Sequence, residues 1–178
     1  MRDEDRGRRR FEVEVLPHLD AAFNLARWLA RDDATAEDVV QSACVRALRF
    51  FDGFQGGSAR AWLLAIVRNT FYSGLRRQRG QEPEAVFDEE VHTVESPGGG
   101  PEATLLRDAD SAQLRQAIAA LPAVFREVIV LREIEELSYK EIAEVTGVPA
   151  GTVMSRLSRA RLALRKSWVT YEKGAPQS

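Results

Sequence analysis

Hydroxyl and guanidinium side chains gather near the C-terminus, in a stretch with the pattern of a helix-turn-helix. The stretch covers residues 137–157. Ser138 can cap a first helix, because Glu141 follows three residues later and completes a capping box. Gly147 can take the left-handed conformation that ends this helix, and Pro149 stands just before a second one. The spacing therefore predicts two short-linked helices, the second of which can enter the major groove of DNA.

The expected second helix has one apolar and one polar arc when successive residues are turned by about 100°. The apolar arc, which should face the core, comprises Val153, Leu157, Ala160 and Leu164. The polar arc comprises Thr152, Ser155, Ser158, Arg159 and Lys166, with Arg156 beside it. Hydroxyl groups and arginines can bond base edges and phosphates, which predicts duplex DNA binding. A solvated amphipathic helix is the alternative, but no acid occurs between Thr146 and Tyr171.

A second group of cations lies in residues 58–79, where arginines and aromatic residues share one side of an expected helix. One arc is apolar: Leu63, Leu64, Val67, Phe71 and Leu75. The other carries Trp62, Ala65, Arg68, Asn69, Tyr72, Arg76 and Arg79. Cations that hold phosphates beside rings that stack on bases are typical of single-strand binding. An ordinary charged surface would explain the arginines but would leave Trp62 and Tyr72 without a purpose.

Charge is segregated along the chain, although the formal net charge is only −2. Residues 60–79 contain five basic residues and no acid, and residues 146–171 contain another five and no acid. Residues 81–110 contain nine acids and one arginine. The two basic segments indicate two nucleic-acid contacts on separate modules, with an acidic segment between them.

Other function classes lack the residues that they need. With Cys44 as the one cysteine and His18 and His92 as the two histidines, we expect no metal site. Cys44 is interpreted as a small buried hydrophobe rather than a redox sensor. No glycine-rich phosphate loop or histidine-paired nucleophile is present, so we expect neither an enzyme nor a bound cofactor. The charged N-terminus and an apolar run no longer than residues 61–67 predict a cytoplasmic protein without membrane insertion.

Helical periodicity predicts the elements that position these residues. We expect helices over residues 12–31, from Thr35 toward Gly53, and from an N-cap at Ser58 to residue 79. Helical pattern returns over residues 102–120, breaks at Leu121-Pro122, and resumes through Leu131. No strand pattern appears, which predicts an all-α fold. Its two small helical domains, residues 1–80 and 102–178, are joined by an acidic, flexible Pro/Gly linker over residues 81–101.

Several runs resemble, in the family's order, the conserved regions of extracytoplasmic-function (ECF) sigma factors of the sigma-70 family. Three runs are similar to region 2: Ala36-Glu37-Asp38-Val39-Val40-Gln41, Arg46-Ala47-Leu48, and Arg60-Ala61-Trp62-Leu63-Leu64-Ala65-Ile66-Val67-Arg68-Asn69. Residues 121–165 are similar to region 4, which contains the helix-turn-helix. The resemblance implies a promoter-recognition subunit that partners bacterial core RNA polymerase and promoter DNA. Whether an anti-sigma factor is a further partner stays open.

The resemblance also implies roles for individual residues. The clamp coiled coil of the polymerase would bind Asp38, Gln41, Arg46 and Arg49. The minus-10 element, melted to a single strand, would meet the loop of residues 52–57 and the next helix through Phe54, Trp62, Arg68, Asn69, Tyr72, Arg76 and Arg77. The minus-35 duplex would be read by Ala150, Gly151, Thr152, Ser155, Arg156, Ser158, Arg159 and Lys166.

Some interpretations stay open at this point. Asp38 could instead cap its helix, with Thr35 as the N-cap. The linker could occupy a basic channel of the polymerase, or it could be a solvated tether. Met154 stands where many relatives carry lysine or arginine, which would weaken a phosphate contact or alter promoter preference. We expect the free protein either to sample many relative domain placements or to be held closed by a partner.

The alternative function is that of a helix-turn-helix transcriptional regulator that acts without core polymerase. Such a protein would be expected to dimerise on a two-fold operator. It would leave the helix of Asp38 and Gln41 without a role, and likewise the aromatic and cationic face that begins at Trp62.

Overall fold

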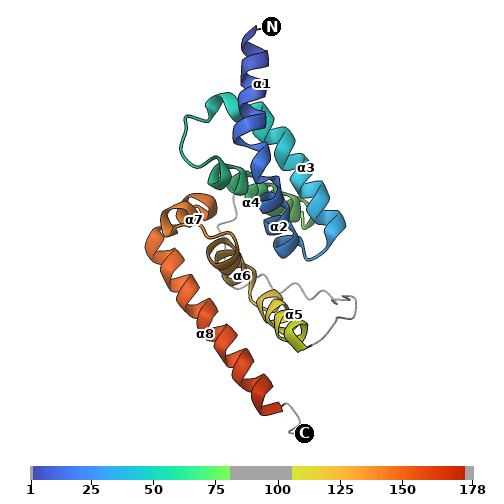
Figure 1. Ribbon diagram of the computed structural model, residues 1–178, viewed down its shortest axis with the longest axis vertical. Helices are drawn as coiled ribbons and strands as arrows, with labels where there is room; N and C mark the ends of the chain where they lie inside the picture. Colours follow the sequence, from blue (N-terminus) through green and yellow to red (C-terminus); the bar gives the residue numbers. More distant parts are fainter. Residues whose placement is uncertain (1, 81–105, 175–178) are drawn as a thin grey trace.

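The computed structural model describes residues 2–80 and 106–174, and the side chains of residues 5–80 and 111–168 (Figure 1). The described residues form helices and short connections, and no strand occurs among them. The all-α prediction is therefore confirmed. The expected linker, residues 81–101, lies outside the described residues, so its mobility and the domain boundary remain predictions.

The N-terminal half contains four α-helices: α1 (Arg2–Glu14), α2 (Leu19–Ala30), α3 (Asp33–Phe50) and α4 (Ala59–Gln78). The single helix expected over residues 12–31 is wrong, because the 3₁₀ turn η1 (Leu16–His18) separates α1 from α2. Pro17 explains the break, since proline lacks an N–H and its ring clashes with the preceding helical turn. The apolar spacing hid the break, because Leu16, Leu19 and Phe23 continue the helical period across Pro17.

Local capping sets where α3 and α4 begin. Asp32, rather than Thr35, is the N-cap of α3, because its carboxylate accepts the Thr35 backbone N–H at 2.7 Å. That hydrogen bond also lowers the pKa of Asp32. Asp38 makes no cap, so its side chain is available for another contact. Ser58 caps α4 as predicted, with its Oγ 3.1 Å from the backbone nitrogen of Ala61.

The C-terminal half contains α5 (Leu106–Ala119), α6 (Ala123–Ile129), α7 (Tyr139–Thr146) and α8 (Ala150–Gly174). The predicted break at Pro122 separates α5 from α6. A π-helical turn, η3 (Val130–Ile134), follows α6 and was not expected from the sequence. It leads into the connection from which α7 starts.

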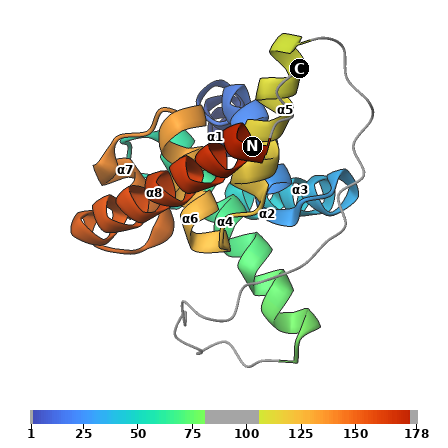
Figure 2. The same cartoon turned by 90° about the horizontal axis from the view of Figure 1, so that it is seen from below.

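The two halves pack directly against one another. Helix α4 lies against α7 and α2 lies against α6, so segments far apart in the sequence are neighbours (Figures 1 and 2). One continuous cluster of buried apolar side chains includes Leu25 and Leu63 of the first half and Ile142 and Leu157 of the second. The structure is therefore closed, with the C-terminal part of α4 projecting away from the packed helices (Figure 2).

Candidate nucleic-acid interface

The helix-turn-helix forms with the capping expected from its sequence. The Ser138 N–H donates to Glu141 Oε2 at 2.8 Å, and the Glu141 N–H donates to Ser138 Oγ at 3.2 Å. The first of these bonds lowers the pKa of Glu141. Gly147 ends α7 with a φ of 70°, and its N–H donates to the Ala143 carbonyl at 2.9 Å. Both ends of α7 are thus fixed locally, which sets the angle at which α8 begins.

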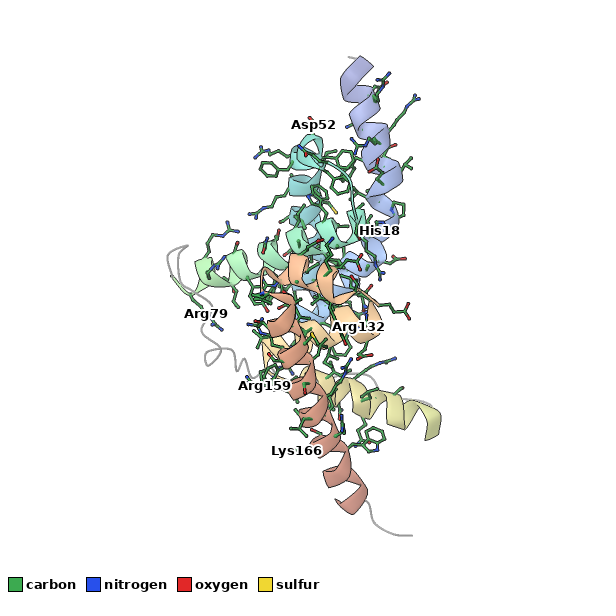
Figure 3. All side chains as sticks on the ribbon, turned by 90° about the vertical axis from the view of Figure 1, so that its left-hand side faces the viewer. His18, Asp52, Arg79, Arg132, Arg159 and Lys166 are labelled. Atoms are coloured by element: carbon green, nitrogen blue, oxygen red, sulfur yellow. The ribbon has the colours of Figure 1, made fainter. Side chains whose placement is uncertain are left out.

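One side of α8 is anchored in the core, and another side is open. Val153, Leu157 and Ala160 are buried as predicted. Six of the predicted duplex-contact residues are exposed: Ala150, Gly151, Ser155, Ser158, Arg159 and Lys166. Thr152 is half-buried and Met154 is 54% exposed. Figure 3 shows Arg159 and Lys166 along the length of α8, so hydroxyl and cationic groups follow one accessible helix.

Arg156 differs from the rest of the predicted set on α8. It is only 6% exposed, and its charge lies close enough to Glu127 and Tyr72 to affect the pKa of both. In the closed arrangement Arg156 therefore faces the interior rather than a DNA groove.

The predicted single-strand face of α4 is split by the packing of the two halves. Asn69 and Arg77 are exposed, and Trp62 and Arg76 are half-buried. Figure 3 places Arg79 at the projecting end of α4. The centre of the face is covered: Arg68 is 8% exposed and Tyr72 is 3% exposed.

Arg68 is held by a carboxylate of the C-terminal half. Its Nε donates a hydrogen bond to Oε1 of Glu127 on α6, and the two side chains form a buried ion pair. The guanidinium also lies over the Tyr72 ring, 4.8 Å from its centroid. Burial raises the pKa of Glu127, and the charge of Arg68 opposes that rise. Burial is likewise the main reason why the pKa of Tyr72 is raised.

The loop that precedes α4 is built on an aromatic cluster. Phe54 is buried, with its ring centroid 5.9 Å from that of Phe51 and 5.1 Å from that of Trp62. The chain then turns through Gly56 and Gly57, whose φ values of 98° and 92° favour glycine. Trp62 thus packs against its own loop, so the ring predicted to stack on a base is partly engaged by protein.

Arg10 of α1 supports this loop, and sequence reasoning missed it. Its guanidinium lies 5.0 Å from the centroid of the Phe51 ring, and its Nη2 donates to the Phe54 carbonyl at 3.4 Å. Arg10 also pairs with Glu14 one helical turn later, at 2.7 Å. The four-residue spacing of Arg10 and Glu14 was the one indication in the sequence, and it predicts only an ion pair on a helix surface.

A groove of about 690 Å³ between α3 and α4 gathers all four predicted polymerase contacts. Asp38, Gln41 and Arg49 are exposed, Arg46 is half-buried, and Arg77 of α4 completes the rim. Within the described part of the chain, none of the four α3 residues has a side-chain hydrogen bond or ion pair. Exposed apolar residues lie on the same helix, with Val45 63% and Phe50 62% accessible. The groove can therefore receive an element that carries both charged and apolar groups.

Three further polar contacts join the two halves, and the sequence analysis did not predict the residues that make them. Glu135, which follows η3, accepts from Arg60 at 2.5 Å and from Asn24 at 2.5 Å. Arg126 donates to the Trp28 carbonyl at 3.1 Å. Sequence spacing gives no signal for such pairs, since their members are 75 to 111 residues apart.

Two negative observations apply to residues 2–80 and 106–174. No group of three or more histidine, cysteine, aspartate or glutamate side chains there could hold a metal ion. No helix in those ranges is long and apolar enough to cross a membrane. Cys44 is half-buried, and burial raises the pKa of its thiol.

Each half of the chain matches a known protein family. Residues 15–81 match the family described as Sigma-70 region 2, and residues 111–164 match the family described as Sigma-70, region 4. The RNA polymerase sigma-H factor of Pseudomonas aeruginosa is 37% identical, over 90% of this chain and 86% of that protein. The chain belongs to the ECF sigma factors of the sigma-70 family.

Two other relatives agree with this assignment. The ECF RNA polymerase sigma factor SigE of Mycolicibacterium smegmatis is 34% identical over 92% of this chain, which spans 63% of that longer protein. A solved structure of the sigma factor RpoE of Bartonella quintana, in complex with the anti-sigma factor NepR, is similar with a TM-score of 0.70. That likeness covers 89% of this chain and 96% of the solved chain at 33% identity.

The regions of this sigma factor correspond to its two packed halves. Region 2 contains α2, α3 and α4, and the region 4 match extends from α5 into α8. Helix α1 precedes the region 2 match, so Arg10 supports the loop from outside it. The contacts of Glu127 and Glu135 therefore join region 4 to region 2.

Proposed function

We propose that this ECF sigma factor recruits core RNA polymerase to promoters through three separate surfaces. The groove between α3 and α4 binds the polymerase. The α4 face and the preceding loop hold the melted minus-10 strand, and the exposed face of α8 reads the minus-35 duplex. Catalysis belongs to the polymerase, and the chain acts in the cytoplasm with it.

One observation carries the polymerase contact. The side chains of Asp38, Gln41, Arg46 and Arg49 lie together in one groove and are engaged by nothing in the described part of the chain. A helix-turn-helix regulator that acts alone has no use for this groove. The groove therefore separates the sigma-factor proposal from that alternative.

The test is run-off transcription with purified core polymerase and genomic fragments, with start sites mapped. We expect new start sites that share two upstream elements. Asp38→Asn should reduce transcription and core binding together, whereas Glu37→Gln changes the same charge on an exposed neighbour that does not line the groove. Failure of the wild-type chain to bind core, with tight binding to a palindromic duplex, would establish the regulator instead.

An anti-sigma factor is a further proposed partner. The support is that the structural relative RpoE was solved in complex with NepR. Copurification with core polymerase in the presence and absence of a candidate inhibitor would test it, because an inhibitor of this kind should lower the amount of core recovered.

A further inference from the structure

Met154 places an apolar side chain on the accessible side of α8, close to the start of the helix. It is 54% exposed. Its neighbours one helical turn away are Ala150 and Gly151 before it and Ser158 after it, and all three are exposed. Leu162, which is 51% exposed, lies about 12 Å farther along the helix axis, at about 1.5 Å per residue. The thioether of Met154 is therefore a single large apolar group on a surface of small and polar residues.

The surroundings of Met154 favour DNA over protein as its partner. Exposed patches that dock proteins are usually contiguous and cover several hundred Å². Met154 has no large exposed apolar neighbour one turn away, and hydroxyl and cationic side chains such as Ser155 and Arg159 share the open side of the helix. No acid occurs between Thr146 and Tyr171 to repel phosphates.

Gly151 leaves room for close approach of a second molecule beside Met154. Glycine lowers the stability of a helix relative to alanine, so its presence within α8 calls for a reason. The backbone supplies none, because Gly151 is not among the glycines with positive φ. Packing supplies none either, because a Cβ built at this position would have no atom within 4 Å. The missing side chain leaves space on the outer surface, which lets the backbone of α8 sit deep in a groove.

The major groove of DNA offers one apolar group to such a side chain. Thymine presents its C5-methyl group and the O4 acceptor there, whereas the other three bases present only polar edges. The hydroxyl of Ser155 donates to the Thr152 carbonyl at 3.0 Å, so it has no proton left for O4. Next to Ser155, a thymine is thus distinguished best through its methyl group, and Met154 is the side chain that can contact it.

We propose that Met154 reads the C5-methyl group of one thymine in the minus-35 element and so sets the base preference at that position. The proposal rests on the minus-35 function proposed above for α8. It adds the identity of one base, the group on that base that is recognised, and the side chain that recognises it.

Replacement of thymine by deoxyuridine is the sharpest test, because it deletes the methyl group and keeps the base pair. Holoenzyme is titrated with a labelled duplex that carries the mapped minus-35 element, and each thymine of the element is replaced in turn. For the wild-type protein we expect one replacement to raise Kd roughly fourfold, the effect of burying one methyl group. The other replacements should change Kd less than twofold.

Three exposed substitutions identify the side chain responsible. Met154→Gln keeps the length but removes the apolar end, so it should raise Kd for the thymine duplex roughly fourfold and abolish the response to deoxyuridine. Met154→Leu keeps an apolar side chain and should retain most of that response. Leu162→Gln is the matched control, because Leu162 is about equally exposed on the same helix, and it should retain the full response. Unchanged denaturation midpoints would show that all three variants are folded.

The remaining outcomes separate this inference from the function on which it rests. An element without thymine, tolerance of deoxyuridine at every position, or an undiminished response in Met154→Gln would overturn the reading by Met154. The role of α8 would survive these results if a changed base pair in the element still weakened binding. No preference for the mapped element over the changed duplex would overturn the minus-35 function itself. Reduced transcription in Met154→Gln with unchanged duplex binding would assign Met154 to a protein contact instead.

Discussion

Arg159 is the residue at which folding and DNA recognition should separate most cleanly. It is exposed on α8, and it makes no hydrogen bond or ion pair with the described residues. Replacing Arg159 by alanine therefore removes no hydrogen bond or ion pair within the described part of the chain. The matched control is Arg165→Ala, since Arg165 is also exposed and unpaired in the described part of the chain. Arg165 is displaced by about 120° around the helix from Arg159.

The exposure of Arg159 and Arg165 sets the expected changes in stability and in DNA affinity. For both variants the free energy of unfolding should change by no more than about 0.5 kcal/mol, as for most surface substitutions. If Arg159 contacts a base edge, its loss should weaken specific duplex binding by about 1–3 kcal/mol. That range corresponds to roughly a five- to 150-fold rise in Kd. Arg165→Ala should show only the weaker and sequence-independent effect of a lost charge.

The assay is anisotropy titration of holoenzyme with a labelled duplex that carries a mapped minus-35 element, and with the same duplex after one base pair of that element is changed. Arg159→Ala should reduce the difference in Kd between the two duplexes. A titration at several salt concentrations separates a base contact from a phosphate contact, because loss of one phosphate contact lowers the salt slope by about one. Equal losses for Arg159→Ala and Arg165→Ala on both duplexes would refute the assignment of this face.

Four further substitutions test the local structure. Ser138→Ala should cost about 1 kcal/mol of unfolding free energy in denaturant titration, because it removes the cap of α7. The pKa of Glu141 is lowered in the folded protein, so the carboxylate contributes to stability at pH values above its ordinary pKa. This contribution is lost as the pH falls through the lowered pKa. Glu141→Gln should therefore remove this pH dependence of the unfolding free energy. Leu157→Ala should cost about 2–5 kcal/mol because Leu157 is buried, whereas exposed Leu162→Ala should cost less than about 0.5 kcal/mol. Arg10→Ala should speed amide exchange in residues 54–57 without changing exchange in α7, and unchanged exchange in the loop would contradict its supporting role.

Features that depend on neighbouring residues could be predicted from the sequence. The caps at Ser58 and Ser138, the left-handed Gly147 and the break at Pro122 each depend on a few adjacent residues. The predicted N-cap of α3 was wrong, and the reason is again local. Asp32 and Thr35 are both acceptable N-caps, and the pattern of later residues does not choose between them. Pro17 was passed over because the apolar period continues across it.

Features that depend on distant pairs could not be predicted. Arg68 and Tyr72 have the residue types of an open nucleic-acid face, and no pattern within α4 indicates that a carboxylate 59 residues away covers them. Arg156 lies at the edge of the polar arc of α8, where a small rotation decides between groove and interior. The sequence identified the groups that could bind nucleic acid, and tertiary packing decides which of them are accessible.

Helix α4 shows why closure need not block every partner of a sigma factor. Its Phe71, Leu75 and Arg77 line the groove that faces α3, whereas Arg68 and Tyr72 face region 4. The groove residues of α3 stay accessible while the two halves are packed together. Polymerase binding through the groove is therefore sterically compatible with the closed chain, while occupation of Arg68 by a DNA phosphate is not.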